Sequence, residues 1–124
     1  MATKFFKCDT CGNVVVKNVD SGVPVVCCGK PMTELVANTV DASQEKHVPV
    51  VTRIDDCTIK VEVGSVEHPM APEHHIAFIY VETENGGILQ YLKDKPAATF
   101  CVCNDRPIAV YEYCNLHGLW KTEL

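Results

Sequence analysis

The residues of this chain that could do chemistry are its histidines and cysteines, and most of them form two groups. The first group combines four histidines with one cysteine: His47, His68, His74, Cys114 and His117. Four imidazoles and one thiolate could bind a single metal, and this mixed set points to redox-active iron. The second group consists of four cysteines near the N-terminus: Cys8, Cys11, Cys27 and Cys28. Four thiolates could hold a separate, tetrahedral metal.

The N-terminal cysteines have nearly the spacing of a four-cysteine metal site. Cys8-x-x-Cys11 is followed after fifteen residues by a second pair, but that pair is adjacent. Neighbouring side chains of an extended strand point to opposite faces, so Cys27 and Cys28 can share one metal only if the backbone bends between them. We therefore expect a distorted tetrahedron. Ligand type leaves iron and zinc equally open at this site.

The histidines of the larger group fall where the chain is expected to turn. Pro49 biases the backbone away from helix just after His47, and two prolines between His68 and His74 make a continuous helix unfavourable there. We therefore expect His68 and His74 to lie on a loop, where one metal can gather them.

Two further features bear on the ligands of the larger group. Cys114 and His117 are three positions apart, close enough to chelate one ion in a tight turn. If residues 74–81 are extended, His74 and His75 face opposite ways, and only one of them easily reaches a metal held by His68. Periodicity alone does not say which.

Short strands dominate the remaining pattern. In the larger part of the chain, three strand pairs flank turn residues, and no 3.6-residue period is sustained. This pattern favours an all-β chain with an antiparallel sandwich. The expected strands are residues 4–7, 14–16, 23–26, 48–54, 58–63, 76–82, 88–92, 99–103 and 108–113.

Composition and length suggest two unequal domains. Residues 1–36 form a small cysteine-bearing unit, residues 37–46 read as a polar linker, and the unit spanning 37–124 carries the sandwich. So short an N-terminal unit cannot bury enough apolar surface alone, so a structural metal or a partner chain is expected. With 47% hydrophobic and 22% charged residues among 124, the whole chain can build an ordinary core.

Charge and hydropathy exclude two classes of partner. A net charge of −5 argues against nucleic acid. No apolar run approaches the roughly 18 to 20 residues that span a bilayer, and no hydrophobic signal region precedes Cys8. We therefore expect no membrane association and a cytoplasmic location, where free thiols act as ligands rather than forming four disulfides.

Three cysteines fall outside both groups. Cys101 and Cys103 are two apart on an expected strand and so share one face, which would allow a disulfide or a metal pair. We expect these two and Cys57 to pack in the core instead.

Several stretches of the chain resemble a known family. The N-terminal part resembles the desulforedoxin module in Cys8-Asp9-Thr10-Cys11 and in Cys27-Cys28-Gly29-Lys30-Pro31-Met32. The remainder resembles the catalytic domain of superoxide reductases in Glu45-Lys46-His47-Val48-Pro49, in His68-Pro69-Met70 with His74, and in Cys114-Asn115-Leu116-His117-Gly118-Leu119-Trp120. Together they are similar to the two-iron desulfoferrodoxin family over essentially the whole chain.

The resemblance implies a ligand set and a fold. It implies that four histidines bind iron in one plane, with a cysteine as the axial thiolate: His47, His68, His74, His117 and Cys114. It selects His74 over His75, and it implies iron at the four cysteines as well, so two iron ions per chain. An immunoglobulin-like sandwich for the larger domain and a homodimer are also implied.

The resemblance implies an activity too. This is the one-electron reduction of superoxide to hydrogen peroxide, with reduced rubredoxin or a similar carrier as electron donor. Five protein ligands leave a sixth position of an octahedral ion open to a small anion. Lys46 is the expected electrostatic guide for superoxide, and Glu45 resembles the family glutamate that can occupy the open position in the oxidised state.

Other functions compete with this one. In an electron-transfer protein of rubredoxin type, the four cysteines would be the working site and the histidines incidental. A zinc protein, structural or hydrolytic, would use the same ligands. A nucleophile and base made of Cys114 and His117 is weaker, because no third orienting group can be named.

Overall fold

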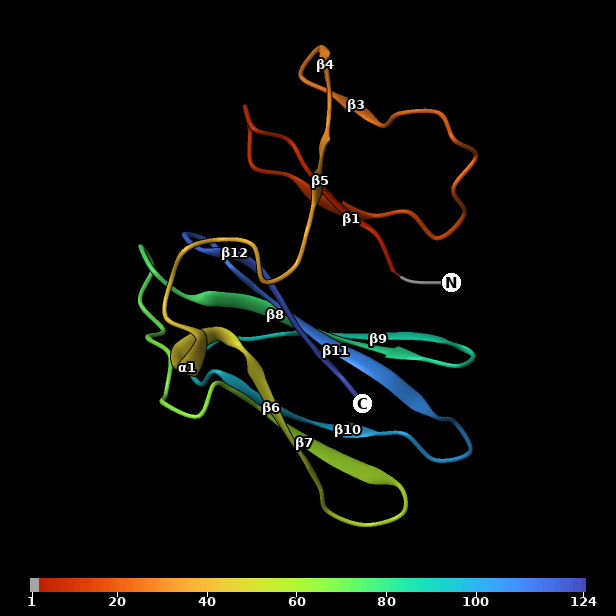
Figure 1. Cartoon of the computed structure of the whole chain (residues 1–124), viewed down its shortest axis with the longest axis vertical. Helices are drawn as coiled ribbons and strands as arrows, with labels where there is room; N and C mark the ends of the chain where they lie inside the picture. The colour runs from red at the N-terminus through yellow and green to blue at the C-terminus, as the bar shows by residue number, and fades with distance from the viewer. Residues whose placement is uncertain (1–2) are drawn as a thin grey trace. The chain divides into compact units, whose positions relative to one another are not determined.

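The computed structural model describes residues 3–124, which divide into two compact units (Figure 1). One unit ends at Val36 and the other begins at Ala37. Both are built from strands, apart from one short helix, so the prediction of an all-β chain is confirmed.

The smaller unit is made of two small antiparallel sheets. The three-stranded sheet has the order β2-β1-β5, and β3 pairs with β4 as a two-stranded ribbon. Phe5 on β1 is 1% exposed and, with Cys8, is its main buried residue. The bounds are β1 (Phe5–Lys7), β2 (Val14–Val16), β3 (Val26–Cys27), β4 (Lys30–Pro31) and β5 (Thr33–Leu35).

The expected strands of the smaller unit are partly wrong. The strand expected at residues 23–26 is reduced to Val26–Cys27, while β4 and β5 have no counterpart among the expected strands. Both are very short, and they are mostly exposed, so they lack the apolar alternation from which strands are recognised.

The larger unit is an antiparallel sandwich of two open sheets, as expected (Figure 1). One sheet has the order β10-β7-β6 and the other β12-β11-β8-β9. The bounds are β6 (Pro49–Arg53), β7 (Thr58–Val63), β8 (Ile76–Thr83), β9 (Gly86–Tyr91), β10 (Ala97–Cys101), β11 (Pro107–Cys114) and β12 (Gly118–Glu123).

Alternation along the strands places the core between these sheets. On β7, Ile59, Val61 and Val63 are at most 1% exposed, while Lys60 and Glu62 between them face outward. Residues of β8, β10 and β11 complete the same apolar cluster, in which Cys114 at the end of β11 is also buried. The strand that carries this cysteine is therefore fixed by the core.

The third expected hairpin is wrong. Residues 99–103 and 108–113 were expected to pair across the turn at residues 104–107. Instead β10 pairs with β7, and β11 lies between β8 and β12 in the other sheet. The turn residues look the same whether the next strand stays in one sheet or crosses to the other. β12, which covers the far side of β11, has no counterpart among the expected strands.

The one helix among residues 3–124, α1 (Gln44–His47), was not expected either, since residues 37–46 were read as a linker. It is a single turn, closed by a hydrogen bond from the Val48 amide to the Gln44 carbonyl at 2.9 Å, and it ends at His47 because Val48, the residue before Pro49, is extended. No helix among residues 3–124 is long and apolar enough to cross a membrane.

The three remaining cysteines also differ from expectation. Cys57 and Cys103 form a disulfide, and Cys101 is exposed with a free thiol. Core packing was therefore the wrong prediction for all three. Cys57 precedes β7 and Cys103 follows β10, and these two strands are neighbours, which brings together cysteines 46 positions apart.

Candidate metal centres

Five donors of the larger unit come from four different places in the sandwich. His47 lies on α1, His68 and His74 lie on the connection from β7 to β8, Cys114 ends β11, and His117 lies in the turn to β12. One ligand atom of each lies within 4.8 Å of all the others. The structure thus groups the five residues that the sequence suggested.

Hydrogen bonds fix the lone pairs of two of these imidazoles. His47 Nδ1 is 2.6 Å from the Ser43 carbonyl and His68 Nδ1 is 2.7 Å from the Pro69 carbonyl, and a carbonyl oxygen can only accept, so both Nδ1 atoms carry protons. In neutral rings both Nε2 atoms then present lone pairs, yet they lie 3.1 Å apart. Two lone pairs repel at that distance unless a cation lies between them.

The remaining donors meet the same centre. His117 Nδ1 is also 3.1 Å from His47 Nε2, and Cys114 Sγ is 3.5 Å from His68 Nε2. Nitrogen ligands about 2.1 Å from one ion and at right angles would be about 3 Å apart, which is the spacing observed. The donor set therefore fits a metal ion.

His74, rather than its neighbour, joins this set. Its Nε2 is buried and is one of few buried side-chain atoms without a hydrogen-bond partner among the described residues. His75 Nδ1 instead lies 3.1 Å from each of the Ala71 and Pro72 carbonyls. An unpaired buried nitrogen is costly, and a metal would satisfy it.

Burial sets the protonation of the ligands. It lowers the pKa of His47, against the opposing Ser43 carbonyl, and lowers the pKa of His68 to about 4. Both imidazoles are therefore neutral near pH 7, as ligation requires. Burial also raises the pKa of the Cys114 thiol, so this sulfur becomes a thiolate only with a cation beside it.

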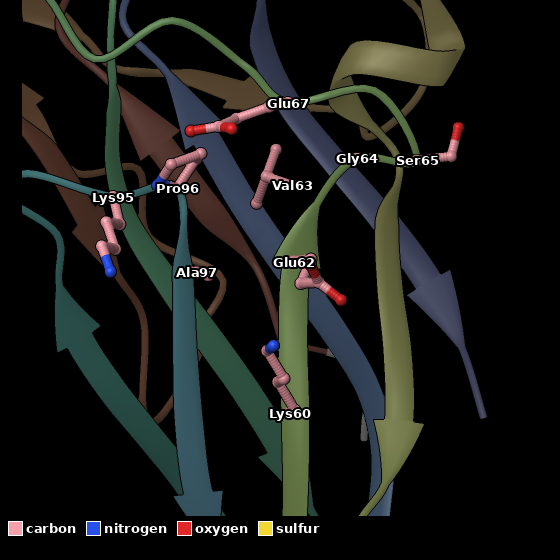
Figure 2. A pocket seen from close by; sticks show the side chains of 9 residues that line it. All are labelled: Lys60, Glu62, Val63, Gly64, Ser65, Glu67, Lys95, Pro96 and Ala97. Atoms are coloured by element: carbon pink, nitrogen blue, oxygen red, sulfur yellow. The ribbon is translucent and has the colours of Figure 1, made fainter.

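A tight turn after β7 holds α1 in place. The Val66 amide donates to the Glu45 carbonyl at 2.9 Å, and the Ser65 hydroxyl donates to the same carbonyl at 3.3 Å. A Cβ on Gly64 would lie 2.6 Å from that oxygen, so only glycine allows the approach. Figure 2 shows Gly64 and Ser65 beside the ribbon of α1. The turn thereby positions Glu45, Lys46 and His47.

Two residues that the sequence analysis did not assign to the site orient its ligands. The Trp120 ring stacks on His47 at 4.9 Å between centroids, and its Nε1–H donates to the His117 carbonyl at 3.0 Å. The Asn115 side chain accepts from the His75 amide at 2.8 Å and donates to the Glu73 carbonyl at 3.0 Å, which ties the turn after β11 to the segment carrying His74.

A buried acid lies on the strand that carries the cysteine ligand. Glu112 is fully buried, and neither carboxylate oxygen has a hydrogen-bond partner in the described part of the chain. Burial raises its pKa to about 9, so it is a neutral acid near pH 7. Nothing in the sequence separates it from an exposed strand glutamate.

Two hollows lie near the centre, and only one of them reaches it. The cavity of about 460 Å³ in Figure 2 is lined by Lys60, Glu62, Glu67, Lys95 and others, none of which is a donor. A second opening is lined by Lys46, Glu67, His68, Pro69, Met70 and Asp94. Because it includes the ligand His68, we take the second opening as the way in.

The four cysteines of the smaller unit also meet, with one ligand atom of each within 4.8 Å of the others. Cys11 Sγ and Cys27 Sγ are 3.6 Å apart, close to the roughly 3.8 Å of sulfur ligands about 2.3 Å from one tetrahedral ion. Cys28 has φ 53°, so the backbone bends at the vicinal pair as its geometry requires.

Without a cation these thiols would ionise unequally. The Cys11 amide lowers the pKa of Cys8 to about 6, while the neighbouring sulfurs Cys11 and Cys8 raise the pKa of Cys28 to about 12. One thiolate thus stabilises protons on the others. A metal ion would favour deprotonation of all four, so this donor set also fits a metal.

Comparisons with known proteins agree across both units. Residues 39–123 match the family model for desulfoferrodoxin, and residues 2–35 match that for the desulfoferrodoxin N-terminal domain. A desulfoferrodoxin of Syntrophotalea carbinolica is 48% identical over 95% of this chain and 94% of its own length. A superoxide reductase of Pyrococcus horikoshii is 35% identical, covering 68% of this chain and 90% of its own.

The structural comparison extends over the whole chain. The crystal structure of the superoxide reductase from Treponema pallidum matches with a TM-score of 0.82 and 36% identity, covering 99% of this chain and 100% of that one. Two family models, near full-length relatives and a full-length structural match all agree. The chain belongs to the desulfoferrodoxin family.

Proposed function

We propose that this chain is a superoxide reductase, which adds one electron and two protons to superoxide and releases one hydrogen peroxide. The observation that carries the proposal is the mostly buried cluster of four imidazoles and one thiol in the larger unit. Relatives and a full-length structural match named superoxide reductase support it.

Within this proposal, five donors would hold one iron ion: the imidazoles of His47, His68, His74 and His117 and the thiolate of Cys114. Bound iron would supply the electron to superoxide, favoured by a thiolate donor as in cysteine-ligated haem. The protein's part is to keep these imidazoles neutral by burial, to hold the protons of His47 and His68 on Nδ1 through the Ser43 and Pro69 carbonyls, and to keep the thiolate out of water.

Lys46 and Glu45 are the proposed catalytic residues beside the ligands. Lys46 lines the opening that includes His68, so its ammonium can attract the superoxide anion. A cation about 4 Å from the anion contributes roughly 1 to 4 kcal/mol, depending on the local dielectric. Glu45 precedes it on α1, and from the family resemblance its carboxylate would be a further ligand for the oxidised iron.

The second metal and the partners complete the proposal. Cys8, Cys11, Cys27 and Cys28 would hold a second iron, and reduced rubredoxin or a similar carrier would return electrons to the protein. A cytoplasmic location follows from the need of both centres for reduced thiols. We propose that residues 1–36 and 37–124 are the two domains of the chain. We also propose that the chain forms the homodimer that the family resemblance implies.

Metal analysis and superoxide consumption test the function together. We expect two irons per chain and, on mixing reduced protein with superoxide in a stopped-flow instrument, one hydrogen peroxide for each superoxide consumed. Half a peroxide per superoxide, with oxygen released, would mean dismutation. Colourless protein containing zinc, or iron protein that leaves superoxide unchanged, would overturn the proposal.

The accessory parts have separate tests. Reduced rubredoxin should sustain repeated turnovers of superoxide reduction. If this protein does not oxidise reduced rubredoxin, then rubredoxin is not its electron donor. Light scattering should give twice the chain mass for the homodimer.

A further inference from the structure

Three cysteines that neither metal centre uses lie at one corner of the larger unit. Cys57 precedes β7, and Cys101 and Cys103 surround the end of β10. Cys101 pairs in register with Thr58, the residue after Cys57. Val102, which lies between Cys101 and Cys103, donates its amide hydrogen to the Cys57 carbonyl at 2.6 Å. The backbone thus holds all three residues within one strand pairing.

The disulfide at this corner is open to solvent. Cys103 is exposed and Cys57 half-buried, while Val102 beside them is 3% exposed and anchors the chain in the core. Exposed disulfides are more easily reduced than buried structural ones. The exposed Cys101 thiol, two residues from Cys103, adds a third sulfur that can take part in exchange.

The rest of the protein sets the conditions under which this disulfide exists. The other six cysteines of the described chain are outside disulfides, and five of them belong to the two metal centres. Such ligands need a reducing compartment, where the disulfides that do occur are mostly transient, catalytic or redox-sensing. A permanent structural bridge on the surface does not fit that setting.

We propose that Cys57, Cys101 and Cys103 form a thiol–disulfide exchange site, separate from both metal centres, that small thiols open and hydrogen peroxide closes. On opening, an external thiolate attacks the sulfur of Cys103, the more exposed residue of the pair. A bond forms between the two sulfurs, the Cys57–Cys103 bond breaks, and Cys57 leaves as a thiolate that takes a proton. A second external thiol then releases Cys103 and leaves as the external disulfide.

Closing uses one molecule of peroxide. The Cys103 thiolate attacks one peroxide oxygen, the oxygen–oxygen bond breaks, and a hydroxide leaves and becomes water. The resulting sulfenic acid is attacked by the Cys57 thiol, which forms the disulfide and releases a second water. Two thiols and one peroxide thus give one disulfide and two waters. That this protein itself releases hydrogen peroxide rests on the proposed function. The reaction of the three cysteines with peroxide does not depend on it.

The experiment uses the intact metal-loaded protein with two probes, reduced glutathione and added hydrogen peroxide. We expect millimolar glutathione to open the Cys57–Cys103 disulfide without denaturant, and peptide mass spectrometry to find glutathione on Cys103 or Cys101. After the glutathione is removed, one equivalent of peroxide should restore the disulfide, while the visible spectrum shows that the metal centres are intact. Because peroxide is added directly, failure here leaves the proposed superoxide reduction untouched.

Matched variants separate the roles of the cysteines. Cys103→Ser should lose peroxide-driven closure of the disulfide. Cys101→Ser should retain this closure, but disulfides and glutathione adducts formed at residue 101 should disappear. A disulfide that opens only in denaturant, or a reduced pair that peroxide does not close, would show a structural bridge and overturn the proposal. A Cys101 that never appears in a disulfide or adduct would remove it from the site.

Discussion

The two metal centres of this chain are built in opposite ways. In the smaller unit the donors lie on turns and at the ends of short strands, and only Cys8 of the four cysteines is buried. In the larger unit His47, His68 and Cys114 are at most 2% exposed, and Cys114 belongs to the apolar core. One centre has little protein around it, and the other is enclosed by a sandwich.

This difference separates two uses of a metal. The smaller unit has short strands and hardly any core beyond Phe5, so metal binding must supply most of its folding free energy. The larger unit has its own core, so its fold brings the five donors together before any ion arrives. We therefore treat the first metal as part of the fold and the second as part of the chemistry.

Removing both metals is the strongest way to break this comparison. We expect residues 3–36 to lose their amide protection against hydrogen exchange completely, because the ligand set supplies on the order of 10 kcal/mol in such sites. Protection in β7, β8 and β11 should remain. Measurement under reducing conditions keeps the thiols free. Lasting protection of Phe5 and its neighbours would show that the smaller unit folds without a metal.

Adding a Cβ to the turn that contacts α1 should impair the larger unit and leave the smaller unit unchanged. Gly64→Ala would force its Cβ against the Glu45 carbonyl, at a cost of roughly 1 to 3 kcal/mol, and would shift His47 and Lys46. We expect slower superoxide reduction and a changed thiolate-to-iron absorption band, with the smaller unit's spectrum unaltered.

The matched control for this variant is Ser65→Ala. It removes only the 3.3 Å hydrogen bond to the same carbonyl and adds no volume, so its effect should be much smaller. Equal effects of the two substitutions would contradict the steric explanation.

Charged residues at the opening should change the rate of superoxide reduction, with Lys46 raising it and acidic residues lowering it. Lys46 is opposed there by Glu67 and Asp94. Replacing Lys46 by Ile should slow the second-order reaction with superoxide about three- to tenfold at low ionic strength, and Asp94→Asn should accelerate it about twofold. Rapid-mixing rates against salt would measure both. Rates that do not respond to either change would remove electrostatic guidance.

The smallest effect concerns the pH dependence of the smaller unit. The Gly22 amide, with Lys17 and Lys4, holds the pKa of Asp20 well below its usual value. The unfolded chain therefore binds this proton more readily, and the stabilisation is present above about pH 4 and is lost as pH falls through the folded value.

Asp20→Asn should accordingly lower the denaturation midpoint of the smaller unit near pH 7. The difference from the unmodified protein should shrink as pH falls below about 4. A difference that does not change with pH would mean that Asp20 acts through packing or hydrogen bonding alone.

Sequence reasoning worked where the signal was local. The alternation of β7 gave residues 58–63, which are its observed bounds, and turn residues identified the β6–β7 and β8–β9 hairpins. It failed for β10 and β11, because which sheet a strand enters depends on partners distant in sequence.

The candidate site follows the same rule. Residue type and spacing suggested the donors, but Glu112 and Cys57 could not be assigned, because burial and a partner 46 positions away are properties of the whole fold. The choice between His74 and His75 came from the family resemblance, since both orientations fit an extended strand equally well.

The central claim is that superoxide is reduced at the enclosed centre and not at the exposed one. The most direct measurement is the first reaction of fully reduced protein with superoxide, compared between Cys114→Ser and Cys28→Ser. We predict that Cys114→Ser slows this reaction by tenfold or more while the sandwich stays folded, and that Cys28→Ser leaves it unchanged. The account would be contradicted if Cys28→Ser abolished the reaction with superoxide while Cys114→Ser retained it.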